Sequence, residues 1–121
     1  MDNPFVLVVD DDRNIVRILE AWLSKAGYHV ESATNGAQAY KRALAPQCKC
    51  VLLDMEMPGG NGAEFLLLLH SEDRDTPVVI VTGFTDFEEE EMKQFANVRA
   101  FLKKPMSRND IVATVNMLVV P

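Results

Sequence analysis

Three consecutive aspartates, Asp10 to Asp12, directly follow the apolar run Phe5–Val9. Two unit charges roughly 4 Å apart repel each other by about 4 kcal/mol at an effective dielectric constant of about 20, so this arrangement needs something that offsets the repulsion. Solvent, the free amides at a helix start, or a bound cation would do so. Carboxylate oxygens are the ligands that a hard cation such as Mg²⁺ takes, together with water and substrate phosphate.

Polar residues also follow three later apolar runs. Cys50–Leu53 is followed by Asp54, Val78–Val81 by Thr82, and Ala100–Leu102 by Lys103 and Lys104. A carboxylate can act as a nucleophile toward phosphorus and form an acyl phosphate. A hydroxyl and an ammonium suit the phosphoryl oxygens, and the reaction depends on positioning and charge neutralisation more than on a base.

Short apolar runs and helical patterns alternate along the chain, which predicts a parallel sheet with helices on both faces. The predicted strands are Phe5–Val9, a weak Tyr28–Ala33, Cys50–Leu53, Val78–Val81 and Ala100–Leu102. The predicted helices are one with the apolar face Ile15–Leu23, stopped by Gly27, then Asn35–Leu44, Ala63–His70, Phe87–Phe95 and Ser107–Val119, with Ser107 as its cap. The 121 residues suffice for one α/β domain, spanning residues 1–121.

The strand ends are expected to meet in one crevice. If the sheet is flavodoxin-like and doubly wound, with the order 2-1-3-4-5 and five flanking helices, the strand order reverses between the first and third strands; this order is an expectation from the family resemblance given below and not from the sequence pattern. Ligands bind beyond the carboxyl ends of the strands at that reversal. Asp10, Asp11 and Asp54 would converge there, with Thr82 and Lys104 along the rim.

Charge and composition narrow the function. The net charge of −6 argues against direct binding to nucleic acid, because phosphates would be repelled. No apolar run reaches the roughly 20 residues needed to span a membrane, and the N-terminus carries no secretory signal, so we expect a cytoplasmic protein. Cys48 and Cys50 lack nearby partner ligands for a metal and are expected to be ordinary thiols.

Four motifs give the chain its resemblance to a known family. They are V-V-D-D-D at 8–12, D-M-E-M-P-G-G-N-G at 54–62, T-G at 82–83 and F-L-K-K-P at 101–105. Each alone is weak, but four in order, each at a predicted strand end, are specific together. Over its whole length the chain resembles a response-regulator receiver domain, the phosphoacceptor module of two-component signalling.

The resemblance implies a metal-assisted phosphorylation site. Asp54 would be the phosphorylated aspartate. Asp10, Asp11, Asp54 and the backbone carbonyl of Glu56 would hold Mg²⁺. The domain would catalyse only its own phosphorylation and dephosphorylation, and is not expected to be an enzyme otherwise.

Four further positions take roles from the same resemblance. Thr82 and Lys104 would bind phosphoryl oxygens. Thr82 and the aromatic Phe101 would form the switch that reports phosphorylation, although Phe101 could equally be an ordinary core residue. Pro105 would follow Lys104 through a cis peptide bond.

The implied partner is a histidine kinase or a histidine phosphotransfer domain that supplies the phosphoryl group. The face formed by the fourth helix, fifth strand and fifth helix would rearrange, and either a second copy or a downstream output protein could bind it.

Three alternatives remain at this stage. Asp12 is better interpreted as the cap of the first helix than as a metal ligand. The chain could be a degenerate receiver that binds proteins without phosphorylation. It could also be a haloacid-dehalogenase-like phosphatase, but that class expects a threonine or valine shortly after its aspartate pair, where this chain has Arg13 and Asn14.

Overall fold

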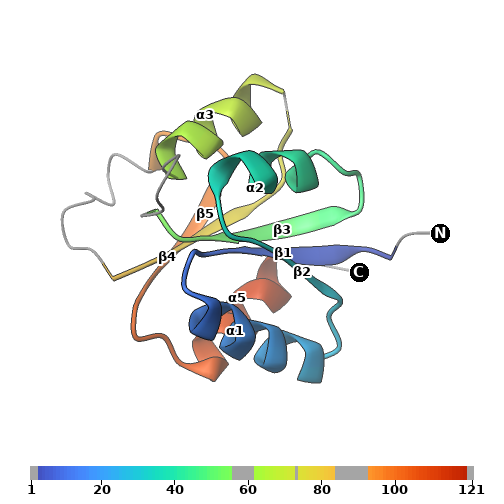
Figure 1. Cartoon of the computed structure of the whole chain (residues 1–121), viewed down its shortest axis with the longest axis vertical. Helices are drawn as coiled ribbons and strands as arrows, with labels where there is room; N and C mark the ends of the chain where they lie inside the picture. Colours follow the sequence, from blue (N-terminus) through green and yellow to red (C-terminus); the bar gives the residue numbers. More distant parts are fainter. Residues whose placement is uncertain (1–2, 56–61, 73, 84–92, 120–121) are drawn as a thin grey trace.

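The computed structural model describes residues 3–55, 62–72, 74–83 and 93–119. In chain order the elements are β1 (Phe5–Val9), α1 (Arg13–Lys25), β2 (Val30–Ala33), α2 (Gly36–Ala43), β3 (Cys48–Leu53), α3 (Gly62–Ser71), β4 (Val78–Thr82), β5 (Val98–Lys103) and α5 (Arg108–Leu118). The strands are all parallel and form one sheet of order β2-β1-β3-β4-β5 (Figure 1). The predicted sheet and strand order are therefore confirmed.

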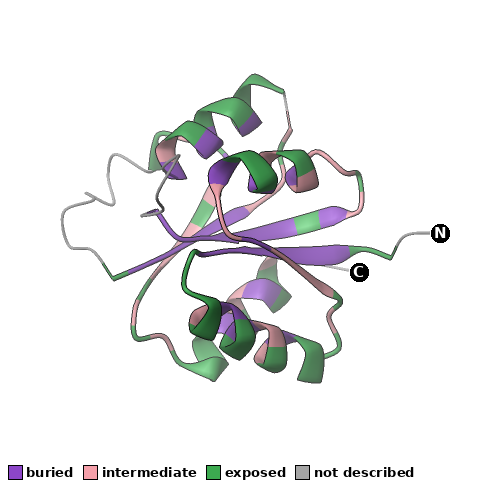
Figure 2. Cartoon of the chain, viewed as in Figure 1, coloured by how far each residue is buried: buried purple, intermediate pink, exposed green. Residues whose placement is uncertain are grey.

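Helices cover both faces of the sheet, with α1 and α5 on one side and α2 and α3 on the other (Figure 1). Successive residues of a strand point to opposite faces. Val6 and Val8 of β1 therefore belong to the core beneath α1 and α5, whereas Leu7 and Val9 belong to the core beneath α2 and α3. Figure 2 shows buried residues running along the central strands and exposed residues on the outer sides of the helices. This two-sided burial explains why the strands are continuous apolar runs.

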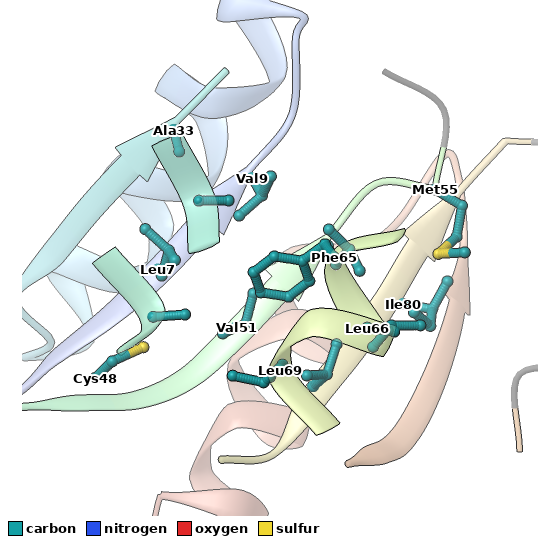
Figure 3. Close-up of a cluster of buried hydrophobic side chains, with 14 of the residues drawn as sticks. Leu7, Val9, Ala33, Cys48, Val51, Met55, Phe65, Leu66, Leu69 and Ile80 are labelled. Carbon is teal, nitrogen blue, oxygen red and sulfur yellow. The ribbon is translucent and has the colours of Figure 1, made fainter. Parts of the chain in front are cut away.

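The leucine-rich helix α3 anchors the core on its side of the sheet. Its side chains Phe65, Leu66 and Leu69 are buried and point toward Val51 of β3 and Ile80 of β4 in Figure 3. Burying each side chain of this size stabilises the fold by roughly 1.5–3 kcal/mol. The packing fixes the positions of the two strands whose ends carry Asp54 and Thr82.

The helix ends follow the predicted sequence signals. Asp12 caps α1 by accepting the Asn14 N–H at 2.9 Å, and Ser107 caps α5 by accepting the Asp110 N–H at 3.0 Å. Gly27, which follows α1, has a φ of 101°, a left-handed conformation that disfavours any residue with a Cβ. The caps predicted at Asp12 and Ser107 and the stop at Gly27 are confirmed.

Strands β3 and β5 begin two residues earlier than predicted, because each contains a bulge near its start. The register passes from Phe5–Cys48 to Val6–Cys50, and from Val78–Val98 to Val79–Ala100. The residues left over, Lys49 and Arg99, are exposed. Conversely, β2 starts at Val30 instead of the predicted Tyr28.

The first bulge sends the two thiols to opposite sides of the sheet. Cys48 lies in the core with α2 and α3, and Cys50 lies in the core with α1 and α5. Both thiols are free and buried. The expectation that they are ordinary core thiols agrees with this placement.

The described residues contain four helices, and none of these is long and apolar enough to cross a membrane. The predicted helix Phe87–Phe95 falls almost entirely outside the described residues. Of its last three positions, residue 93 is helical and residues 94 and 95 lie in a turn, so its predicted end is two residues too late.

Candidate functional site

Main-chain hydrogen bonds position three of the polar residues at the carboxyl end of the sheet. Each of the three donates its N–H to the carbonyl of the last residue of a neighbouring strand. The bonds run from Asp10 to the Ala33 carbonyl (3.2 Å), from Asp54 to the Val9 carbonyl (2.9 Å) and from Lys104 to the Thr82 carbonyl (2.9 Å). The strand ladder thus extends one residue past the strands and fixes where these three side chains begin.

Three carboxylates converge there as predicted. Asp10, Asp11 and Asp54 each offer an oxygen, and these oxygens lie within 4.8 Å of one another. Asp10 and Asp54 are only 2% and 6% exposed, whereas Asp11 is exposed. Buried carboxylates this close repel each other unless cations compensate them.

The Lys104 ammonium supplies part of that compensation. Its Nζ lies 2.8 Å from Asp10 Oδ2 and 3.4 Å from Asp54 Oδ2. Burial by itself lowers the pKa of Lys104, but the hydrogen bond and charge of Asp10, together with the charge of Asp54, outweigh burial and raise the pKa above its usual value. Lys104 is therefore a positive charge held between the two buried carboxylates.

The three consecutive aspartates have different tasks. Asp10 accepts the Asp12 N–H with Oδ1 at 2.9 Å and binds Lys104 with Oδ2, so both of its oxygens are oriented. Asp12 points to its own helix and caps α1. Asp11 remains exposed, beside the buried pair. The sequence interpretation of Asp12 as a cap is confirmed.

Thr82 ends β4 and is fully buried. In the register of the sheet it pairs with Lys103, next to Lys104. Phe101 pairs with Ile80 two positions earlier, and is partly buried against the core beneath α2 and α3. The Lys104–Pro105 peptide bond is cis, the conformation that the resemblance implied. Glu56 lies outside the described residues.

Gly62, the last residue of the motif at 54–62, lies so close to Met55 that it has no room for a side chain. A Cβ at Gly62 would lie 2.6 Å from Met55 Sδ and 2.9 Å from Met55 Cα. The Gly62 N–H donates to the Met55 carbonyl at 3.3 Å, directly after Asp54. Any larger residue would therefore push on the chain that carries Asp54. The signal in the sequence was a glycine at the start of a helix, where it has no propensity advantage.

The donor set fits a hard divalent cation. All three converging side chains offer carboxylate oxygens, and Mg²⁺ binds through one or two carboxylates, waters and phosphate oxygens. Three carboxylates against one ammonium leave an excess of negative charge that a dication would balance. Softer metals prefer nitrogen and sulfur ligands, which this cluster does not contribute.

Comparison with protein families now identifies the domain. A family model for the response regulator receiver domain matches residues 6–116. This chain belongs to the response regulator receiver family. Receiver domains are the modules of two-component systems that sit between a histidine kinase and an output, and they are not a conventional enzyme family.

Curated relatives support this assignment. The chain is 30% identical over 119 residues to the transcriptional regulatory protein PrrA of Mycobacterium leprae, covering 98% of this chain and 51% of the relative. It is 30% identical over 115 residues to the regulatory protein VanRB of Enterococcus faecalis, covering 94% of this chain and 51% of the relative. The chain thus spans about half the length of these relatives.

Solved structures agree. The Francisella response regulator 1452 receiver domain superposes with a TM-score of 0.84 at 27% identity, covering 96% of both chains. The response regulator TrrA of Thermotoga maritima, in complex with Mg²⁺ and BeF, gives a TM-score of 0.84 at 27% identity and covers 94% of this chain and 97% of that one.

Proposed function

We propose that this receiver domain accepts a phosphoryl group on Asp54 from the phosphohistidine of a partner kinase or phosphotransfer domain. The observation that carries the proposal is the buried Asp54 carboxylate at the end of β3, beside two further carboxylates and the Lys104 ammonium. A partly desolvated carboxylate with a fixed cation nearby is a nucleophile placed for charge-neutralised phosphoryl transfer.

The transfer balances without a base from the protein. The Asp54 oxygen forms a bond to phosphorus as the phosphorus–nitrogen bond to the partner's imidazole breaks, and the imidazole, protonated on its other ring nitrogen, leaves as the neutral ring. Lys104 Nζ lies 3.4 Å from an Asp54 oxygen, so it is close enough to bind an oxygen of the new phosphoryl group. The Thr82 hydroxyl at the end of β4 is the second group we assign to a phosphoryl oxygen.

Asp10, Asp11 and Asp54 would hold Mg²⁺, together with the main-chain carbonyl of Glu56, which lies outside the described residues. The ion supplies positive charge that offsets the developing negative charge on the phosphoryl oxygens. The carboxylates of Asp10 and Asp11 do not react in this scheme; they would hold the ion in place beside Asp54.

The readout begins at Thr82 and Phe101. We infer that the Thr82 hydroxyl moves to bind the phosphoryl group. Because Thr82 is buried at the end of β4, this movement would shift the end of that strand and change the position of the Phe101 ring on the neighbouring strand β5. A pocket of about 110 Å³ borders Phe101, and this space supports a ring that can change its rotamer. Such a change is a shift between two pre-existing populations, biased by the new charge.

The proposal includes a fifth helix before β5, as the sequence predicts. The connection into β5 repeats the one that follows α2. The N–H groups of Cys48 and Val98 donate to the carbonyls of Ala45 and Phe95, each at 3.0 Å, and both strands then bulge at their second residue. A helix that enters β5 as α2 enters β3 would complete the output face with β5 and α5. A second copy of the chain or an output domain in the cytoplasm would bind this face.

The test is the intact mass of the protein after incubation with acetyl phosphate and Mg²⁺. We expect one phosphoryl adduct on the wild type and on the control Asp75→Asn, whose carboxylate is exposed and lies before β4. The adduct should be absent from Asp54→Asn and absent in EDTA. An unmodified wild type would overturn the proposal and favour a receiver that binds partners without phosphorylation.

A further inference from the structure

A polar groove of about 390 Å³ lies at the end of the edge strand β2, between α1 and α2. These helices lie on opposite faces of the sheet (Figure 1), so the groove wraps around the sheet's edge. Its lining includes Arg13 and Arg17 of α1, Ser32 and Thr34 at the end of β2, and Gln38 and Arg42 of α2. Phosphoryl transfer to Asp54 uses none of these residues.

Two of the three arginines, Arg13 and Arg17, form no ion pair within the described residues. Arg13 and Arg17 are one helical turn apart, on the same side of α1. Within the part of the chain that the structure describes, neither guanidinium donates to a carboxylate or a carbonyl. Arg42 Nη1 binds Glu31 Oε1 at 2.8 Å, but a guanidinium has five N–H donors and this bond uses one. The groove is thus a cationic patch on a chain whose net charge is −6.

Helix stability does not explain Arg13. It is the first residue of α1, and the first turn of that helix contains no acidic residue. The amino end of a helix carries partial positive charge, so the dipole disfavours a cation there, although Asp10, Asp11 and Asp12 directly before Arg13 offset this effect.

The uncharged wall of the groove is rigid. The Gln38 N–H donates to Asn35 Oδ1 at 2.9 Å, and Gln38 Oε1 accepts the Thr34 N–H at 3.1 Å. This pair is similar to a capping box at the start of α2, except that Gln38 accepts the N–H of Thr34, which precedes the cap residue Asn35. Because the side-chain oxygen of Gln38 is committed to Thr34, the side-chain NH₂ is the end left to donate to a ligand.

We propose that this groove binds a compact phosphate-bearing anion with at least two negative charges. Guanidinium groups match phosphate oxygens with paired N–H donors. The volume is in the range of small-molecule sites, which begins at about 300 Å³. Among the described residues that line the groove, only Val16 and Ala33 are apolar, and none has an aromatic ring on which a nucleobase could stack. Glu20 of α1 also lines the groove, one helical turn after Arg17, so the anion is expected on the side of Arg17 that faces Arg13.

The experiment is an amide-resolved NMR titration of the chain with inorganic pyrophosphate, at physiological salt and in EDTA. We expect saturable shifts at Ser32, Thr34 and Gln38. Arg17→Gln should weaken binding by about tenfold, which corresponds to the loss of a hydrogen bond to a charged group. The matched control is Arg108→Gln, which removes one exposed positive charge from α5. A parallel titration with glucose 6-phosphate distinguishes a sugar phosphate from a polyphosphate as the preferred source of the anion.

Three results would overturn the proposal. Pyrophosphate and glucose 6-phosphate could both fail to saturate any shift, or the shifts could map to Asp54 and Lys104, or Arg108→Gln could weaken binding as much as Arg17→Gln. Arg17 is exposed, so its variant is expected to fold, and its amide spectrum would show this directly.

Discussion

The carboxyl end and the amino end of the sheet both bury polar side chains. At the carboxyl end these are Thr82 and the carboxylates Asp10 and Asp54, which are 2% and 6% exposed and both contact Lys104. At the amino end it is Asn97, at 3% exposure, which lies just before β5. Its Nδ2 donates to the Arg74 carbonyl at 2.6 Å and to the Thr76 carbonyl at 3.0 Å.

The difference lies in charge and in the kind of partner. Asn97 is neutral, and its side-chain amide donates to the main-chain carbonyls of the partly buried Arg74 and Thr76, so it ties the segment before β4 to the turn before β5. The carboxylates at the other end carry like charges that repel one another. Burial of a polar group therefore stabilises the fold at the amino end, whereas at the carboxyl end the like charges of the buried carboxylates cost stability.

The largest effect on stability is expected at the amino end. Asn97→Ala removes both donors and leaves the carbonyls of Arg74 and Thr76 unpaired, so the free energy of unfolding should fall by about 2–4 kcal/mol. Urea denaturation measures this. Asn109→Ala, at an exposed position of α5, is the control and should change the free energy by less than about 0.5 kcal/mol. If both variants lost the same free energy of unfolding, Asn97 would not be a stabilising residue of the amino end.

At the carboxyl end the sign should reverse. In EDTA, Asp54→Asn removes one of three converging charges, and the free energy of unfolding should rise by about 1–2 kcal/mol. The exposed control Asp75→Asn should leave it within about 0.5 kcal/mol of the wild type. If Asp54→Asn instead destabilised the protein as strongly as Asn97→Ala, the carboxylate would be a structural residue and the contrast would fail.

The start of β3 offers a third test of buried groups, because the strand that precedes Asp54 carries two buried thiols near its amino end. Burial raises the pKa of both Cys48 and Cys50 from 9.0 to about 12. The folded thiols therefore stay neutral while unfolded thiols ionise, so their contribution to stability is nearly full at pH 7, begins to fall as the pH approaches 9 and is lost progressively as the pH rises toward 12. Between pH 7 and pH 9 the two thiols together should cost roughly 0.5–1 kcal/mol.

Urea denaturation under reducing conditions at both pH values tests this expectation. The double variant Cys48→Ala/Cys50→Ala should lose less stability than the wild type over the same interval. Parallel losses in the two proteins would show that the thiols ionise as readily in the folded chain as in the unfolded one.

Local patterns in the sequence predict much of this architecture. Apolar runs and helical spacing predict the five strands, and the short-range signals at Asp12, Ser107 and Gly27 predict the helix ends. The order of the strands comes from the resemblance to receiver domains and not from these patterns. The convergence of Asp10, Asp11 and Asp54 also followed, because the carboxyl ends of parallel strands must meet at one end of the sheet.

What could not be predicted depends on contacts between distant residues. The bulges at Lys49 and Arg99 set the true starts of β3 and β5, and a single-strand pattern does not contain the register of its neighbour. Asn97 looks like any turn residue until the segment before β4 packs over it. The preference of Lys104 for Asp10 over Asp54 joins residues 94 positions apart and depends on side-chain geometry.

The most direct test of the account is to locate the phosphoryl group. Borohydride reduces an aspartyl phosphate to homoserine, and peptide mapping then identifies the converted residue. After treatment with acetyl phosphate and Mg²⁺, we expect homoserine at position 54 and unchanged aspartate at positions 10 and 11. Conversion at Asp10 or Asp11, or at none of the three in a protein that carries an adduct, would contradict the assignment of Asp54 as the acceptor.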